Sequence, residues 1–450
     1  MTSMRVLGVA LFVEWCLFTT VAPDCGSPSP SAVPNLLPVD TRPPTLVRTI
    51  KNAKLFTVGT GEDSYYVLHL YGTPYEMGFA QGSIVKDEAT SMIQQVWQYM
   101  QDQIVGGITK KLKFLDWFLD EVATFGLDAA LDLELLATKK YTSQAFFDEV
   151  RGLADATGQD YKTILYIHLI GELTKGSCSM IGAWGDSLAR NGSLLQLRAL
   201  DWAVDGPFKD FPQVTVYHPV NTTYGQPWAN FGWTGWIGSI TGMNSVKMAI
   251  SEIGVSFPDA SFGKESRFGI PFTNILRDIL QYDTTLNAAV QRITNAKRTC
   301  DLLLGVGDGK SKTFRGVEYS ASTANFYDDA TLQPLAVWHP RIKDVVYWGM
   351  DWECPGYSQV LATQIQRNYG HLDASLVMRD VVSIVQTGNM QVAVYDLTEN
   401  IAYLANARGS FESGPEYAYE RQFVRMNMTQ IFAEPMPSLI PHTHCILCPK

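Results

Sequence analysis

A cysteine, an arginine and an aspartate near the middle of the chain have the types and spacing that acyl-transfer chemistry requires. Cys178 lies in the segment TKGSCSM at 174–180, and Arg198 and Asp201 follow on one predicted strand. The thiolate is the reactive form of cysteine and a nearby guanidinium favours it, while a carboxylate can accept or orient the proton of the attacking group. Cys178, Arg198 and Asp201 are therefore the candidate catalytic residues.

The geometry of these three residues sets a condition on this interpretation. Residues three apart on an ideal strand face opposite sides of the sheet, so a bulge or a strand end must bring Arg198 and Asp201 to one site. The competing interpretation makes Cys178 half of a disulfide and Arg198 with Asp201 a surface pair. From these residues alone, both interpretations stand.

Helices are predicted to dominate the chain up to Cys178. A strand over 65–70 leads into TPYE at 73–76, which supplies an N-cap, a proline at the first helical position and a capping-box glutamate for a helix that runs to about residue 103. Four more helices are predicted at 114–125, 128–139, 143–157 and 161–173. Cys178 itself is predicted to lie between a helix and a turn that contains Gly182 and Gly185.

Strands are predicted to dominate from Leu194 onward. Short β-branched and aromatic runs occur at 194–202, 213–218, 236–241, 246–255, 301–306, 313–319, 345–350, 390–397 and 401–405. Helices are predicted at 270–281, 285–297, 357–368 and 373–386. Helices inserted between antiparallel strands predict an α+β fold with two sheets sandwiched by helical layers.

The composition excludes several classes of function. The 450 residues are 46% hydrophobic and carry a net charge of -10, with basic residues scattered along the chain, so a folded core is expected and nucleic acid is not a predicted partner. The chain contains neither a phosphate-binding loop nor a dinucleotide fingerprint, and no cofactor is predicted. Cys445 and Cys448 have metal-site spacing but lack a second pair, so no metal is predicted either.

Several features predict entry into the secretory pathway. An apolar run at 6–22 follows Arg5 and is predicted to be a signal peptide spanning 1–22, with a membrane anchor as the alternative. Asn191, Asn221 and Asn427 each start a glycosylation sequon. The predicted location is lysosomal or secreted, where disulfides are favoured over metal clips.

The order of four motifs resembles a known family. These are GTPYEMGFAQG at 72–82, Cys178, RALDW at 198–202 and GSITGMN at 238–244. In this order they resemble the Cys-type N-terminal-nucleophile hydrolases, in particular the acid ceramidase-like and isopenicillin N acyltransferase-related group. The likeness extends from about residue 45 to about residue 407. It implies a four-layer αββα sandwich.

The resemblance also implies a self-processing precursor. The thiol of Cys178 would attack the carbonyl of Ser177, an N-to-S acyl shift would form a thioester, and water would release a new α-amino group on Cys178. That amine has an ordinary pKa of about 7.7–8.0, so it can act as general base for its own thiol. Residues 23–177 and 178–450 would become two chains that together form one domain.

Individual roles follow from the same resemblance. Cys178 matches the nucleophile, Arg198 the arginine that lines the thiol and the substrate head, and Asp201 the carboxylate that holds the amine. Asn244 is an available amide for the oxyanion, with an ordinary turn residue as its alternative. Asp301 stands where relatives have an asparagine, and an aspartate donates a hydrogen bond only when it is protonated, so low pH or a backbone donor would be needed.

The expected function is hydrolysis of N-acyl amides, with ceramide-like lipids among them, through an S-acyl-enzyme. An acyltransferase that uses the same thioester, or a non-catalytic secreted glycoprotein, is the alternative. The expected partners are this small-molecule or lipid substrate and, transiently, membrane lipid. The aromatic residues Trp228, Phe231, Trp233 and Trp236 would suit an acyl slot or the plain core.

The cysteines give a further expectation. If Cys178 is kept as a thiol, five cysteines remain after signal removal. Cys25 is expected to bond a cysteine of the later fragment, and Cys300 with Cys354 is the other predicted pair.

Overall fold

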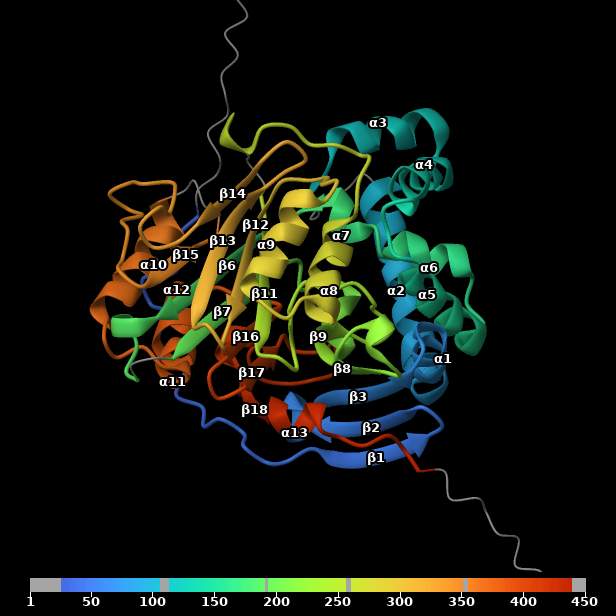
Figure 1. Cartoon of the computed structure of the whole chain (residues 1–450), viewed down its shortest axis with the longest axis horizontal. Helices are drawn as coiled ribbons and strands as arrows, with labels where there is room; N and C mark the ends of the chain where they lie inside the picture. Colours follow the sequence, from blue (N-terminus) through green and yellow to red (C-terminus); the bar gives the residue numbers. More distant parts are fainter. Residues whose placement is uncertain (1–25, 106–112, 191–192, 256–259, 351–354, 439–450) are drawn as a thin grey trace, which may run out of the picture.

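A computed structural model describes residues 26–105, 113–190, 193–255, 260–350 and 355–438. Within these residues the strands form two large sheets (Figure 1). The larger sheet contains, in spatial order, β1 (Thr45–Ile50), β2 (Ala53–Val58), β3 (Tyr65–Gly72), β8 (Pro212–Pro219), β9 (Trp228–Trp233), β10 (Gly242–Asn244), β11 (Met248–Gly254), β12 (Leu302–Asp308), β13 (Thr313–Tyr319) and β14 (Ala324–Tyr327). The smaller sheet contains β15 (Val345–Trp348), β6 (Ser177–Trp184), β7 (Leu194–Asp201), β16 (Gln391–Asp396), β17 (Ile401–Asn406) and β18 (Val424–Asn427). A short ribbon joins β4 (Lys113–Phe114) to β5 (Thr174–Lys175).

The two large sheets pack against each other and helices cover their outer faces. Strands β6 and β7 contact β11 and β12 across the interface. Helices α8 (Phe272–Tyr282) and α9 (Leu286–Asn295) lie on the larger sheet, and α10 (Pro355–Arg367), α11 (Ala374–Leu376) and α12 (Ser383–Val385) lie beside the smaller one (Figure 1). A π-helical turn over Val377–Val382 links α11 to α12. The predicted α+β fold, a four-layer αββα sandwich, is confirmed.

Glycines on facing strands let the sheets approach each other. A Cβ atom on Gly182 of β6 would lie 2.2 Å from Cγ of Phe314, and one on Gly305 of β12 would lie 2.5 Å from Cζ of the same ring. The ring of Phe314 therefore fills the space that these two glycines leave. The prediction that Gly182 belongs to a turn is wrong, because the residue is inside β6 and the turn starts at Gly185.

The helices that precede Cys178 lie on the right of Figure 1, with α7 nearest the centre beside α8. They are α1 (Pro74–Ile84), α2 (Lys86–Val105), α3 (Asp116–Phe125), α4 (Leu127–Lys139), α5 (Gln144–Thr157), α6 (Tyr161–Ile167) and α7 (Ile170–Leu173). The predicted capping box is confirmed, since the backbone N–H of Thr73 donates to Glu76 Oε2 at 2.9 Å and Thr73 accepts from the Glu76 backbone. The predicted helix from 73 to 103 is two helices, because Val85 has φ −124° and ψ 44°.

The predicted strand at 236–241 is wrong. Those residues form a loop, and the strand of this region is β9, which ends at Trp233. Gly235 has φ +75°, a left-handed conformation that ends the extended run. Aromatic residues lie on both sides of Gly235, and the prediction placed the strand on the later side.

Some predictions fall outside the described residues. They concern the signal peptide at 1–22, the sequon at Asn191, and the cysteines at 25, 354, 445 and 448. Asn221 is exposed and Asn427 is partly buried at the start of α13 (Met428–Phe432). Across the described ranges, no helix combines the length and the apolar character that crossing a membrane requires.

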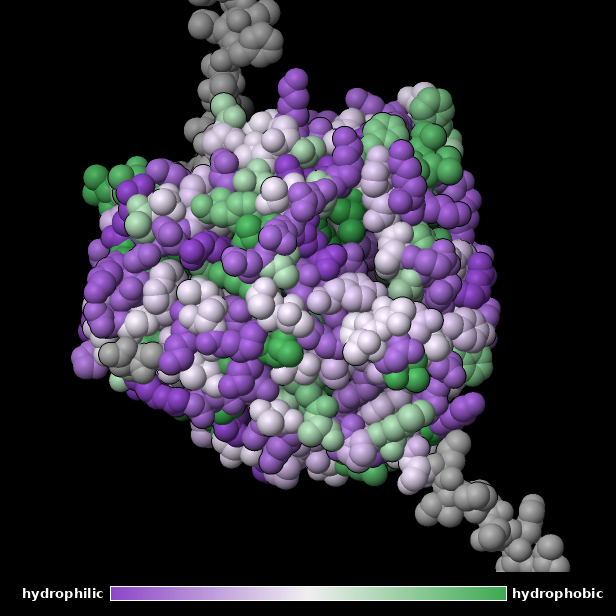
Figure 2. Space-filling view, viewed as in Figure 1, coloured by the Kyte–Doolittle hydropathy of each residue, from purple (hydrophilic) through white to green (hydrophobic). Residues whose placement is uncertain are grey.

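The surface seen in Figure 2 is mostly hydrophilic, with apolar side chains gathered over α3 and α4 at the upper right. Phe125 of α3 and Leu136 of α4 are 61% and 71% exposed.

Candidate active site

Cys178 is the second residue of β6 and lies directly opposite Leu200 of β7. It is a free thiol and is 1% exposed. Burial raises the pKa of the Cys178 thiol to about 12, while the charge of Arg198 acts in the opposite direction. With the Ser177–Cys178 bond intact, the sulfur is therefore a neutral thiol at neutral pH.

Arg198 is completely buried on β7 and forms an ion pair across the two sheets. Its Nη2 donates to Oε2 of Glu252 on β11 at 2.9 Å. Its Nε and Nη1 atoms have no hydrogen-bond partner among the described residues. Two donors of a buried guanidinium are thus available to a group that enters the site.

Glu252 was missed by sequence reasoning. It stands in the strand MAISEIG at 248–254, where every residue is buried. A lone carboxylate in a buried strand requires a cationic partner, and that was the available signal. The identity of the partner could not be read from the sequence, since Arg198 is 54 residues away.

Asp201 is the last residue of β7, so the strand end that the spacing required is present. Its Oδ2 accepts from Thr387 Oγ1 at 2.6 Å, and its Oδ1 accepts from the backbone N–H groups of Gly388 and Asn389 at 2.8 and 3.0 Å. Burial raises the pKa of Asp201 to about 6, although these three hydrogen bonds and Arg198 oppose the rise. The alternative of a surface pair is wrong, because Arg198 is fully buried and Asp201 is 8% exposed.

Cys178, Arg198 and Asp201 line one pocket. Its other lining residues are mostly apolar or small: Gly171, Thr174, Gly176, Leu200, Trp202, Trp236, Ile240, Glu252, Gly254, Phe272 and Leu302. The segment immediately before Cys178 therefore forms part of the wall. Of the four aromatic residues considered for an acyl slot, Trp236 lines the pocket, whereas Trp228, Phe231 and Trp233 are buried elsewhere in the core.

The wall at Trp236 is held by hydrogen bonds to both backbone groups of the next residue, Ile237. The backbone N–H of Ile237 donates to His168 Nε2 at 2.9 Å, and its carbonyl accepts from Arg277 Nη1 at 3.0 Å. The ring of His168 also stacks on Trp236 at 4.8 Å. Burial lowers the pKa of His168 to about 4, so the ring remains a neutral acceptor above that pH.

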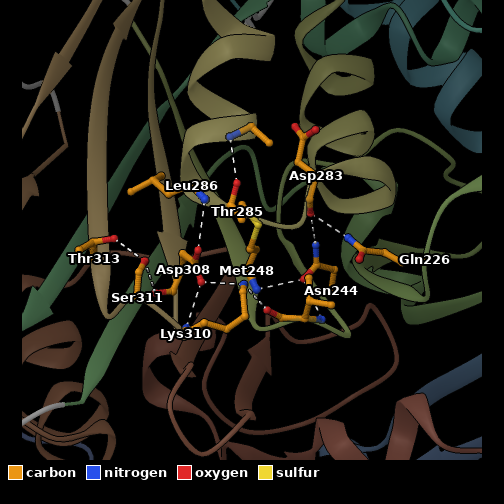
Figure 3. A network of polar contacts seen from close by, with 12 residues as sticks. Gln226, Asn244, Met248, Asp283, Thr285, Leu286, Asp308, Lys310, Ser311 and Thr313 are labelled. Atoms are coloured by element: carbon orange, nitrogen blue, oxygen red, sulfur yellow. Dashed lines mark hydrogen bonds and ion pairs between the residues drawn. The ribbon is translucent and has the colours of Figure 1, made fainter.

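Asn244 lies in a different network, which Figure 3 shows. Its Nδ2 donates to the carbonyls of Leu280 and Asp283 at 3.0 and 3.2 Å, and its Oδ1 accepts from the backbone N–H groups of Val246 and Met248. Figure 3 shows Asn244 beside Asp283 and Met248. Both amide protons are used, and Asn244 is not among the residues that line the Cys178 pocket. The structure therefore places it as a turn residue away from the thiol.

Asp301 is buried immediately before β12. The next residue, Leu302, lines the pocket, whereas Asp301 itself is not among the lining residues. An oxyanion role for Asp301 remains a prediction.

Gly388 allows the turn that holds Asp201, and it provides a test of that turn. It has φ +86°, and a Cβ atom there would lie 2.3 Å from Cγ2 of Val392. We expect Gly388→Ala to lower the free energy of unfolding by at least about 2 kcal/mol, because it adds a clash to backbone strain. Chemical denaturation measures this.

Gly414→Ala is the matched control for Gly388→Ala. Gly414 has φ +88° but no atom within 4 Å of the added Cβ, so it reports backbone strain alone. Equal losses in the two variants would contradict a tight turn at Gly388.

Comparisons with known proteins give one clear relationship. No family model matches the chain. Solved structures similar to it include a Caenorhabditis elegans N-acylethanolamine-hydrolyzing acid amidase ortholog, with 16% identity and a TM-score of 0.38 over 49% of this chain and 93% of that one. Penicillin V acylase from Agrobacterium tumefaciens has 14% identity and a TM-score of 0.33 over 51% of this chain and 83% of that one.

Two curated proteins of Dictyostelium discoideum are much more similar in sequence. Protein dcd1A is 35% identical over 92% of this chain and 95% of its own length. Protein dcd1B is 34% identical over 89% of this chain and 81% of its own length. An uncharacterized protein of Archaeoglobus fulgidus is 26% identical over 58% of this chain and 44% of its own length. Because the two Dictyostelium matches extend over nearly the whole chain, this protein belongs to the family of dcd1A and dcd1B.

Proposed function

We propose that this protein is a self-processing cysteine amidohydrolase of the N-terminal-nucleophile type, related to acid ceramidase. The observation that carries the proposal is the free thiol of Cys178 near the start of a strand, in one apolar pocket with Arg198 and Asp201. The convergence of a buried thiol, a guanidinium with unpartnered donors and a hydrogen-bonded carboxylate is typical of a reactive site.

Self-processing begins at the Ser177–Cys178 bond. The thiol attacks the Ser177 carbonyl carbon, and the C–N bond breaks as the proton moves to the leaving nitrogen. The acyl group is then a thioester on Sγ, and water hydrolyses it to the Ser177 carboxylate and a free Cys178 thiol with an α-amino group. The amine can accept the thiol proton, and the carboxylate of Asp201 is placed at the adjacent strand end to hold it.

Amide hydrolysis then repeats the chemistry on a substrate. The thiolate attacks the acyl carbonyl, the α-ammonium group protonates the departing amine, and water releases the acid from the S-acyl-enzyme. The negative charge on the substrate oxygen needs donors in place beforehand. The Nε and Nη1 groups of Arg198 are suitable donors because no described residue uses them.

The proposed substrates are N-acyl amides with long acyl chains, such as ceramide-like lipids. Leu200, Trp202, Trp236, Ile240 and Phe272 give the pocket an apolar wall that suits an alkyl chain. The exposed apolar residues on α3 and α4 (Figure 2) suit transient contact with membrane lipid. A lysosomal or secreted location belongs to the same proposal.

Substrate length and pH provide a test with processed enzyme. We expect faster turnover of long-chain N-acyl amides than of acetyl amides, with higher activity below neutral pH than above it. A protonated Asp301 would add a hydrogen-bond donor for the substrate oxygen in acid. The α-ammonium group formed by cleavage lowers the pKa of Asp201 below its value in the uncut chain, so that carboxylate persists into mild acid. A chain-length series assayed at mildly acidic and mildly alkaline pH measures both effects.

Two results would argue against this substrate class. These are equal rates for all chain lengths, or activity that rises steadily into alkali. Products formed with an added amine in place of water would identify the acyltransferase alternative. A chain that stays uncut at 50.0 kDa on reducing gels, with no fragment that starts at Cys178, would favour the non-catalytic glycoprotein.

A further inference from the structure

Two buried hydroxyl groups connect Asp201 to the strand that carries Cys178. Thr387 Oγ1 lies 2.6 Å from Asp201 Oδ2 and 2.7 Å from Ser179 Oγ. The backbone N–H of Met350 donates to Ser179 Oγ at 3.1 Å. Ser179 and Thr387 are both 0% exposed. The hydroxyl pair therefore lies out of contact with solvent.

The direction of the hydrogen bonds in this chain follows from the proton count. A hydroxyl carries one proton, and an ionised carboxylate can only accept. Thr387 Oγ1 faces two oxygen acceptors, Asp201 Oδ2 and Ser179 Oγ, and its single proton goes to the charged one. The proton of the Ser179–Thr387 contact must then come from the Ser179 hydroxyl. The Met350 N–H can only donate, so it supplies the start of the chain. All donors then point toward the carboxylate.

Protonation of Asp201 would disturb this order. If the acid proton were given to Thr387, the Thr387 proton would turn to Ser179, and the Ser179 proton would need a new acceptor. The Met350 N–H cannot serve as that acceptor. The chain of hydrogen bonds therefore favours the ionised carboxylate, and such chains strengthen each member.

We propose that Ser179 and Thr387 are positioning residues that keep the Asp201 carboxylate ionised and directed toward the amine of Cys178. This inference rests on the proposed function of the site. Neither hydroxyl touches the reacting atoms, and both act through Asp201.

The charged and titratable groups around Asp201 show how much the Thr387 hydroxyl contributes to keeping that carboxylate ionised. Arg198 on the same strand favours the carboxylate form. Cys178 on β6 and Tyr419, which follows β17, also face Asp201, and both are neutral in the uncut chain. In the processed enzyme the α-ammonium group of Cys178 favours the carboxylate form as Arg198 does. Burial raises the pKa of Asp201, and the bond from Thr387 is the largest opposing contribution. Losing it should raise that pKa by about one unit, because a hydrogen bond to a charged group is worth roughly one pKa unit or more.

The activity test compares Thr387→Val with Thr387→Ser and Ser179→Ala in the full chain. We expect the acid limb of the kcat/KM profile to move up by about one pH unit in Thr387→Val. Thr387→Ser keeps the hydroxyl and should retain the wild-type profile. Ser179→Ala leaves the proton of Thr387 in place, so its shift should be in the same direction and smaller. Identical profiles in the valine and serine variants would overturn the inference.

A stability test separates this inference from the proposed function. It uses the Cys178→Ala chain, which is expected to stay uncut, with valine or serine at position 387. A carboxyl whose folded pKa is raised above its unfolded value of about 3.9 loses folding stability as the pH rises between the two values. Valine at position 387 raises the folded pKa of Asp201 further, so the loss of folding stability continues to higher pH. The Tm of the valine variant should therefore fall below that of the serine variant by about 1.5 °C more at pH 8 than at pH 5.

The two tests have distinguishable outcomes. If the wild-type protein is inactive and uncut but the Tm gap widens, the proposed function is contradicted and the role of the Ser179 and Thr387 hydroxyls at Asp201 is supported. An active wild-type chain with a constant Tm gap contradicts the polar chain alone. If Thr387→Val does not fold, Ser179→Ala decides, and an unshifted pH profile in that variant overturns the inference.

Discussion

Replacing Cys178 by alanine is expected to abolish both cleavage of the chain and amide hydrolysis, and to leave a folded protein. The same sulfur performs both attacks in the proposed mechanism, and alanine has no nucleophilic atom. Within the described part of the chain the thiol makes no ion pair or disulfide, so the cost in folding stability should be about 1 kcal/mol. Reducing gels and mass-spectrometric assignment of new termini measure cleavage, and a long-chain N-acyl amide measures activity.

Two further variants sharpen this result. Cys178→Ser should cleave slowly or partially, because a hydroxyl is a weaker nucleophile than a thiol near neutral pH. Cys300→Ala removes another buried cysteine, one that lines a separate pocket with Glu172 and Arg267, and should cleave normally. Normal cleavage of Cys178→Ala in a protease-free preparation would refute self-processing.

Arg198→Met is expected to cost about 3–5 kcal/mol of folding stability and nearly all activity. The substitution leaves the Glu252 carboxylate, whose side chain is only 7% exposed, without its cationic partner. An uncompensated buried charge is strongly destabilising. Without Arg198 the pKa of Glu252 should rise further, so the loss should be smaller in mild acid, where that carboxyl can protonate. Chemical denaturation at two pH values measures this.

The double variant Arg198→Met with Glu252→Gln separates stability from chemistry. Removing both charges should recover most of the lost stability, because no unpaired charge remains buried. It should not recover activity, because the Nε and Nη1 donors of the guanidinium are still missing. Full activity in the double variant would show that Arg198 serves only to neutralise Glu252.

Sequence reasoning succeeded where the signal lies within a few residues. The Thr73–Glu76 capping box and the strand at 313–319 are of this kind. The order of Cys178, Arg198 and Asp201 also predicted these three as candidate catalytic residues, because residue types and their spacing are read directly from the sequence. The three-residue spacing of Arg198 and Asp201 also predicted that a bulge or a strand end must bring their side chains to one shared site. Asp201 is the last residue of β7, which meets that requirement.

Tertiary structure alone decided which groups surround those three residues. Glu252 reaches Arg198 from 54 positions away, and Thr387 reaches Asp201 from 186 positions away. Asn244 had the right chemistry for an oxyanion donor, but its amide protons are donated to carbonyls at the end of α8. β6 was missed because Gly182 weakens the local strand signal. Glycine is required at this position because the ring of Phe314 on the opposite sheet occupies the space of a side chain. Local propensity is set by neighbours in the chain, and partners across a sheet interface are set by how the layers pack.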